Sequence, residues 1–168
     1  MAGYILLGIL LLIVLLAAVL LIRTAMLKPT PAKTAQVKLQ DNDRAREYGE
    51  RLAQMVRKET VSSRFDSDKT KFYEFHEILE ELFPLVHQTC EKHVFNGSLL
   101  FKWSGKGKAE PILLMSHHDV GEANGDWEHE PFSGELDDEG RLWGRGTVDT
   151  KPSLFCILTA VEEKLREG

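Results

Sequence analysis

Two histidines and an aspartate adjoin in the stretch LLMSHHDV, residues 113–120. In a strand, successive side chains point to opposite faces, so His117 and Asp119 would share one face and His118 the other. A neutral imidazole and a carboxylate are groups that zinc accepts, and a metal-bound histidine usually donates its second ring N–H to a carboxylate or carbonyl. On its own, however, this spacing is more often a simple hydrogen-bonded pair.

A second stretch, WGRGTVDTK at residues 143–151, places an aspartate just before a predicted helix. Gly144 and Gly146 permit close backbone approach, and a helix start favours anionic groups. A dinucleotide fingerprint would need a third glycine, but Asp149 stands at that position. Taken alone, Asp149 is best explained as a helix cap.

Together, the two stretches resemble the zinc metallopeptidases that include carboxypeptidase S, the aminoacylases and the succinyl-diaminopimelate desuccinylases. PFSGEL and SLFCILTAVEEKL add to the likeness, which is nearest to the carboxypeptidase S branch and covers roughly residues 41–168. The resemblance implies that His117 binds one zinc ion and that Asp149 bridges two. It also implies a catalytic-site role for Asp119, which would hold and polarise His117, and a cis peptide after Asp149.

The reaction implied by the resemblance is hydrolysis of an amide bond, in dipeptides or N-acyl amino acids. Two zinc ions would clamp and activate a water while polarising the scissile carbonyl. The carboxylate base of this family belongs to a Glu-Glu pair well beyond the bridging aspartate. Glu162 and Glu163 are adjacent but follow Asp149 too closely, so we expect them to be solvated residues on a helix face.

Two departures from the family bear on activity. Pro152 replaces the glycine that usually follows the lysine, and two side-chain ligands cannot complete a four-coordinate zinc site. We therefore expect an incomplete portion of a longer hydrolase, truncated and inactive alone; a homodimer is compatible with the complete enzyme. The alternative is a non-catalytic, membrane-tethered interaction module that retains half of a catalytic domain.

The elements expected around these motifs define an α/β fold, with helices flanking a mixed sheet. Apolar residues recur at helical spacing over 45–56 and 72–82, and a third helix is expected from Ser153. Asn96-Gly97 between alternating runs predicts a β-hairpin. The uninterrupted apolar run at 111–115 predicts a central strand covered on both faces.

The amino-terminal part predicts a membrane protein. Residues 4–22 carry no charge, so residues 1–23 are expected to form a transmembrane anchor, followed by a basic linker over 24–40 and the catalytic segment over 41–168. Lysines and an arginine just after the anchor favour a cytoplasmic location for the catalytic segment. A cleaved secretion signal is the alternative, although it would call for a basic start and a shorter apolar core.

The chain has a net charge of −5, and its first 40 residues contain basic but no acidic side chains. The remaining residues are therefore strongly acidic. This remainder has no basic stripe that could follow phosphates, which argues against nucleic acid as a partner. Cys90 and Cys156 are too few for a disulfide framework. The expected partners are a small peptide or N-acyl amino acid substrate and the membrane.

Overall fold

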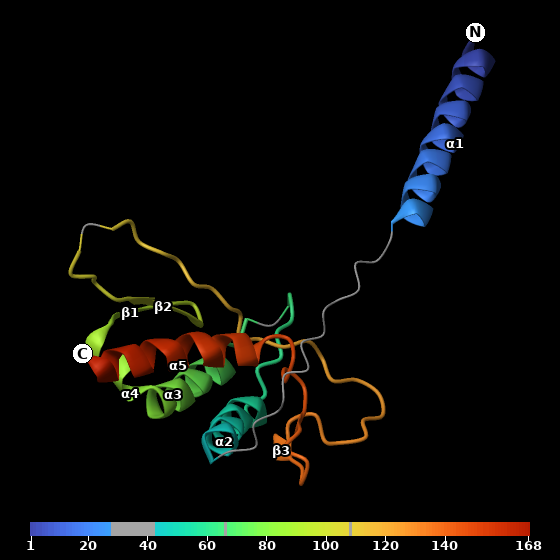
Figure 1. Cartoon of the computed structure of the whole chain (residues 1–168). Coiled ribbons are helices and arrows are strands. Elements are labelled where there is room, and N and C mark those ends of the chain that lie inside the picture. Colours follow the sequence, from blue (N-terminus) through green and yellow to red (C-terminus); the bar gives the residue numbers. More distant parts are fainter. Residues whose placement is uncertain (28–42, 66, 108) are drawn as a thin grey trace. The chain divides into compact units, whose positions relative to one another are not determined.

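The structure is a computed structural model that describes residues 1–27, 43–65, 67–107 and 109–168. The chain divides into two units, Met1–Leu39 and Gln40–Gly168 (Figure 1). Most of the linker expected over 24–40 lies outside the described residues.

The first unit contains helix α1, Ala2–Met26. Within Gly3–Met26, the most apolar stretch of 18 residues has a mean hydropathy of 3.5, and none of that stretch is buried. At about 1.5 Å per residue the helix is long enough to cross a hydrocarbon layer of about 30 Å. Length and composition thus identify a helix that could span a membrane, and a signal sequence at this position would share both properties.

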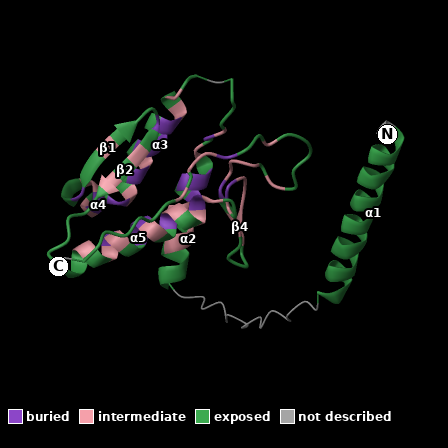
Figure 2. Cartoon of the chain, turned by 90° about the horizontal axis from the view of Figure 1, so that it is seen from above, coloured by how far each residue is buried: buried purple, intermediate pink, exposed green. Residues whose placement is uncertain are grey.

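Four helices build most of the second unit: α2 (Asp43–Arg57), α3 (Thr70–Leu82), α4 (Pro84–Thr89) and α5 (Lys151–Glu167). The three predicted helices are therefore confirmed as α2, α3 and α5, whereas α4 was not predicted. Their apolar faces meet in one core, and the buried residues concentrate on these helices (Figure 2). The core cluster consists of Met55, Phe75, Leu79, Phe83, Val86, Cys90, Phe155 and Leu158.

The strands form two separate antiparallel pairs. Strands β1 (Glu91–Phe95) and β2 (Ser98–Lys102) pair through a two-residue turn, in which Asn96 and Gly97 have φ values of 47° and 88°. These left-handed conformations suit Asn-Gly, so the predicted hairpin is confirmed. Strands β3 (Glu135–Leu136) and β4 (Leu142–Trp143) form the second pair.

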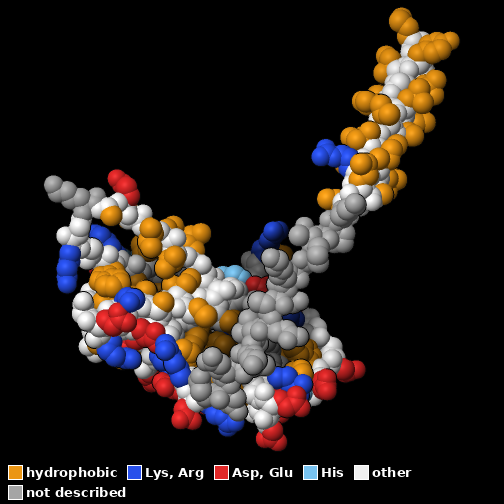
Figure 3. Space-filling view, in the orientation of Figure 1, with side chains coloured by type: hydrophobic (Ala, Val, Ile, Leu, Met, Phe, Trp, Pro, Cys, Tyr) orange, Lys and Arg blue, Asp and Glu red, His pale blue; other side chains and the backbone are white. Residues whose placement is uncertain are grey.

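The apolar run at 111–115 differs from its prediction. This segment forms no strand, and Ile112 to Met115 are 57–84% exposed. Hydrophobic side chains are visible on the surface of this unit in Figure 3. A strand needs neighbours to accept and donate its backbone hydrogen bonds. Within the ranges that the structure describes, only the Val61–Val120 bridge extends this part of the chain into a sheet-like contact.

Glu162 also contradicts its prediction, because it is buried rather than solvated. Its side chain is 2% exposed, and its two carboxylate oxygens accept hydrogen bonds from the backbone N–H groups of Leu85 (3.1 Å) and Val86 (2.9 Å). These donors lie in the first turn of α4, where backbone N–H groups have no partner within the helix. Glu162 therefore caps α4 from α5. Its neighbour Glu163 instead pairs with Arg44 at the surface.

Replacing Leu79 and Leu113 by alanine should separate core from surface. Leu79 is 1% exposed and Leu113 is 70% exposed. We expect Leu79→Ala to lower the free energy of unfolding by about 2–5 kcal/mol, and Leu113→Ala to change it by less than about 0.5 kcal/mol. Urea denaturation of the chain in detergent, followed by tryptophan fluorescence, measures both. Equal losses would contradict the described exposure of Leu113.

Removing the cap on α4 gives a second test of the packing. Glu162→Ala should lower the free energy of unfolding by about 2–3 kcal/mol, because a buried and a partly buried N–H group lose a charged acceptor. Glu162→Gln keeps an acceptor and should lose less. Glu167→Ala, at an exposed position of the same helix, is the control for helix propensity. Equal effects of the 162 and 167 substitutions in urea denaturation would refute the capping role.

Candidate metal site

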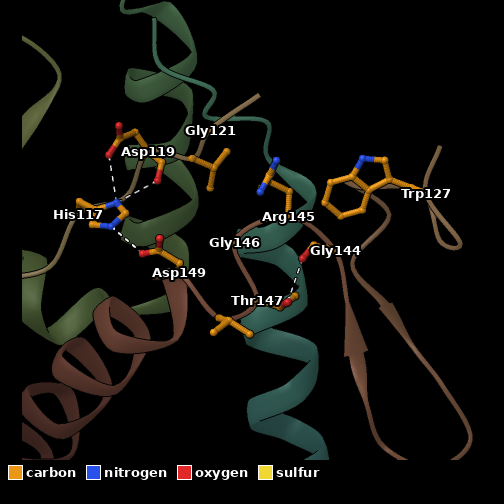
Figure 4. Close-up of a pocket in the computed structure, with 11 residues that line it drawn as sticks. His117, Asp119, Gly121, Trp127, Gly144, Arg145, Gly146, Thr147 and Asp149 are labelled. Carbon is orange, nitrogen blue, oxygen red and sulfur yellow. Dashed lines mark hydrogen bonds and ion pairs between the residues drawn. The ribbon is translucent and has the colours of Figure 1, made fainter. Parts of the chain in front are cut away.

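The structure brings His117 and Asp149 together. The two residues are 32 positions apart in sequence, and the Nε2 atom of His117 lies 3.0 Å from Oδ1 of Asp149 (Figure 4). Their side chains are 52% and 86% exposed, respectively. An imidazole nitrogen and a carboxylate oxygen thus converge at an open surface, and they belong to the two residues that the family resemblance implies as metal ligands.

Asp119 contacts the other ring nitrogen of His117. Nδ1 of the imidazole lies 3.2 Å from Oδ1 of Asp119 and 3.1 Å from its backbone carbonyl oxygen. A proton on Nδ1 can therefore be donated to Asp119, which fixes the ring and leaves Nε2 facing Asp149. The role of Asp119 in holding His117 stays a prediction.

His118 points away from this group, as the alternation of an extended chain requires. Its ring stacks on His76 at a centroid distance of 5.6 Å and packs beside Phe72 and Phe75. Burial lowers the pKa of His118 to about 4, and the neighbouring His76 acts in the same direction. His118 is thus a neutral packing residue at physiological pH.

The loop before α5 positions Asp149 through close backbone contacts. At Gly146, with φ of 93°, an added Cβ would lie 2.9 Å from Cγ1 of Val120. A side chain at this position would push the loop away from the segment that carries His117 and Asp119. The Asp149–Thr150 peptide is cis, as the resemblance implies.

The neighbouring side chains of the site shift the pKa values of His117 and Asp119. Partial burial lowers the pKa of His117, but its hydrogen bonds with Asp119 and Asp149 outweigh this effect, so the pKa is raised. Partial burial would raise the pKa of Asp119, yet the Ser62 hydroxyl and the His117 ring together hold it below its usual value. The carboxylates thus favour the protonated form of His117, and His117 in turn favours the charged form of Asp119.

A cavity of about 270 Å³ lies beside these residues. His117, Asp119 and Asp149 line one side, and the other carries Arg145, whose guanidinium lies 5.1 Å from the centre of the Trp127 ring (Figure 4). The site thus combines anionic groups, a cation and an aromatic surface around one opening. Sequence reasoning did not assign Arg145 or Trp127 to the site, because nothing local marks them as neighbours.

The donor set fits zinc in kind but not in number. Zinc binds histidine nitrogen and carboxylate oxygen, and its protein sites usually have three or four protein ligands. Among the described residues, no group of three or more His, Cys, Asp or Glu side chains is arranged to hold a metal ion. His117 and Asp149 can thus supply two ligands of a larger set.

Comparison with known proteins identifies the class of protein. Residues 113–168 match peptidase family M20/M25/M40, and this range contains both motifs of the site. The matches support an M20 peptidase fragment near the carboxypeptidase S branch, as the family resemblance implies.

Individual relatives support the same assignment. The chain is 39% identical over 130 residues to the probable carboxypeptidase S-like 2 of Dictyostelium discoideum, covering 73% of this chain and 25% of that protein. It is 35% identical over 126 residues to carboxypeptidase S of Saccharomyces cerevisiae, covering 70% and 22%. The N-fatty-acyl-amino acid synthase/hydrolase PM20D1 of Mus musculus is 40% identical over 109 residues, covering 61% and 22%. The chain thus spans about a quarter of the length of these relatives.

The raised pKa of His117 predicts how stability depends on pH. A group with a raised pKa stabilises the folded chain fully below its unfolded value of about 6.5, and this stabilisation is lost as pH rises through the folded pKa. In a chelator-containing buffer, His117→Asn should therefore cost more stability at pH 6 than at pH 8.5. Urea denaturation at both values measures the difference. The difference between the two pH values should be smaller when Asp149 is replaced by Asn. A loss of unfolding free energy that is the same at both pH values would contradict the ion pairs of His117.

Proposed function

We propose that this chain contributes to metal-dependent hydrolysis of amide bonds, carried out by the complete enzyme on dipeptides or N-acyl amino acids. The observation that carries the proposal is the contact between Nε2 of His117 and Oδ1 of Asp149 in an open cavity. The substrate class is supported by the names of the relatives, which include carboxypeptidases and N-fatty-acyl-amino acid hydrolases.

Each site residue has a distinct proposed role. His117 would bind one zinc ion through Nε2, and Asp149 would bridge two zinc ions through its carboxylate. Asp119 would keep the proton on Nδ1 of His117, so that the Nε2 lone pair is available for the metal. When bound, zinc polarises a scissile carbonyl and lowers the pKa of a bound water.

The remaining parts of the active site would come from outside these residues. A zinc site with two protein ligands is short of the usual number, and Glu162, which caps α4, is not available as the base that activates water. We therefore propose that the 168-residue chain does not hydrolyse substrate by itself. The complete enzyme would supply the further ligands and the base, and could form a homodimer.

Helix α1 is proposed to anchor the protein in a membrane by a single pass. Its apolar stretch lacks charged side chains up to Arg23, and further lysines follow in the sequence. Basic residues next to a membrane span favour the cytoplasmic side for the adjoining segment. The proposed organisation is an anchor over 1–23, a basic linker over 24–40 and a peptidase segment over 41–168. If the mature protein lacks residues 1–23, the helix is a cleaved signal and this proposal fails.

A non-catalytic, membrane-tethered module is the alternative function. The specific observation in its favour is the exposed apolar run from Ile112 to Met115, which offers a surface for contact with another protein. The two functions differ at His117 and Asp149, since a module of this kind has no need to bind zinc with these side chains.

Zinc binding by the chain in detergent tests the proposal. We expect His117→Ala and Asp149→Ala each to weaken zinc affinity by more than about tenfold, measured by competition with a chromophoric chelator. His129→Ala is the matched control, because His129 pairs with Glu135 outside the site. Unchanged affinity in both site variants would refute the metal site.

Hydrolysis can be tested in a hybrid enzyme. Residues 41–168 would replace the matching segment of yeast carboxypeptidase S, and release of amino acids from N-acylated dipeptides would be measured. The hybrid should be active, and His117→Ala or Asp149→Ala should abolish the activity. A folded, zinc-loaded hybrid without activity would favour the non-catalytic alternative.

A further inference from the structure

The second carboxylate oxygen of Asp119 has its own partner. Oδ1 faces the imidazole of His117, and Oδ2 accepts a hydrogen bond from the hydroxyl of Ser62. Ser62 is 57 positions away in sequence and belongs to the segment that comes after α2. A carboxylate bonded through one oxygen can rotate about its terminal torsion, which is broad. A hydrogen bond on each oxygen restricts this rotation and fixes the plane that Asp119 presents to His117.

The backbone holds Ser62 in place for this contact. The N–H of Ser62 donates to the carbonyl oxygen of Val120 at 3.1 Å, and the N–H of Val120 donates to that of Thr60 at 3.0 Å. Val61 and Val120 thereby form a parallel bridge. The Thr60 hydroxyl adds a hydrogen bond to the carbonyl oxygen of His118 at 2.7 Å. The segment carrying Ser62 is thus fixed against the segment carrying Asp119.

The same segment also holds the Asp149 side of the site. The Nζ atom of Lys151, two residues after Asp149, donates to the carbonyl oxygens of Met55 at 2.8 Å and Lys58 at 2.7 Å. The side chain of Lys151 is fully buried. The end of α2 and the residues just after it therefore hold both parts of the site in place. Within this segment, Ser62 contacts a side chain of the site directly, namely Asp119.

We propose that Ser62 is a positioning residue for the metal site. Its hydroxyl fixes the Asp119 carboxylate, and Asp119 in turn fixes the His117 ring with Nε2 directed at Asp149. This inference rests on the proposed function, because it assigns Ser62 a role only where His117 binds a metal. Ser62 is exposed, so its hydroxyl contributes to the orientation of the ring rather than to the core.

Three variants of the chain in detergent test the role of Ser62. Ser62→Ala removes the hydroxyl, Ser62→Thr retains it, and Ser63→Ala is the matched control at the next exposed serine. We expect Ser62→Ala to weaken zinc affinity about tenfold, within the range typical of residues that orient ligands. Ser62→Thr should restore most of the affinity, and Ser63→Ala should match the unmodified chain.

Two further readouts distinguish positioning from a merely structural role. The urea midpoint of Ser62→Ala should fall only slightly, because this hydrogen bond is exposed. In the metal-free state, the Nδ1 resonance of His117 in ¹⁵N spectra should shift in Ser62→Ala and return in Ser62→Thr. A parallel loss of stability and affinity, or an unmoved resonance, would overturn the positioning role.

The outcomes also separate this inference from the proposed function. If His117→Ala loses zinc and Ser62→Ala binds it as tightly as the unmodified chain, the role of Ser62 is refuted and the metal site stands. If the unmodified chain and His117→Ala bind zinc equally, both proposals fail. Loss of affinity in both variants, with rescue by Ser62→Thr, supports both.

Discussion

One pair of backbone hydrogen bonds joins the parts of the chain that form the site. These bonds link Thr60 and Ser62 to Val120, and they align the segment after α2 with the extended segment that ends in His117, His118 and Asp119. Because alternate residues of an extended chain face opposite ways, this alignment sends His118 into the aromatic core. It leaves His117 and Asp119 on the open face. The site therefore depends on a contact between segments that are far apart in sequence.

On the Asp149 side of the site, Lys151 places a charged ammonium group inside the protein. A fully buried ammonium group is unfavourable unless its charge is compensated, and burial lowers the pKa of Lys151 to about 8. The compensation comes from the carbonyl oxygens of Met55 and Lys58 at the end of α2, where the helix dipole is negative, and from the face of Phe75 at 5.1 Å. These contacts of Lys151 thus fix the start of α5 close to Asp149.

Structural features that depend only on neighbouring residues could be predicted from the sequence. Features that depend on residues far away in the sequence could not. The Asn96-Gly97 turn and the helical periodicities require only neighbouring residues, and the structure contains both. Whether an apolar run becomes a strand depends on which segments pair with it, so the run at 111–115 could not be settled by its composition. Glu162 has the same explanation, because its burial is set by the N–H groups of α4 rather than by its place on α5.

The candidate site follows the same division. The type and spacing of His117 and Asp119 predict their shared face, but their contact with Asp149 required the family resemblance, and no local signal marks Ser62 as a partner. Contacts within the chain hold this arrangement together. With its raised pKa, His117 can carry a proton on each ring nitrogen and donate to a carboxylate on each side. Because the fold already brings Nε2 of His117 to Oδ1 of Asp149, zinc would bind there without first having to collect these two ligands. The arrangement of these two ligands would then come from the fold rather than from the ion.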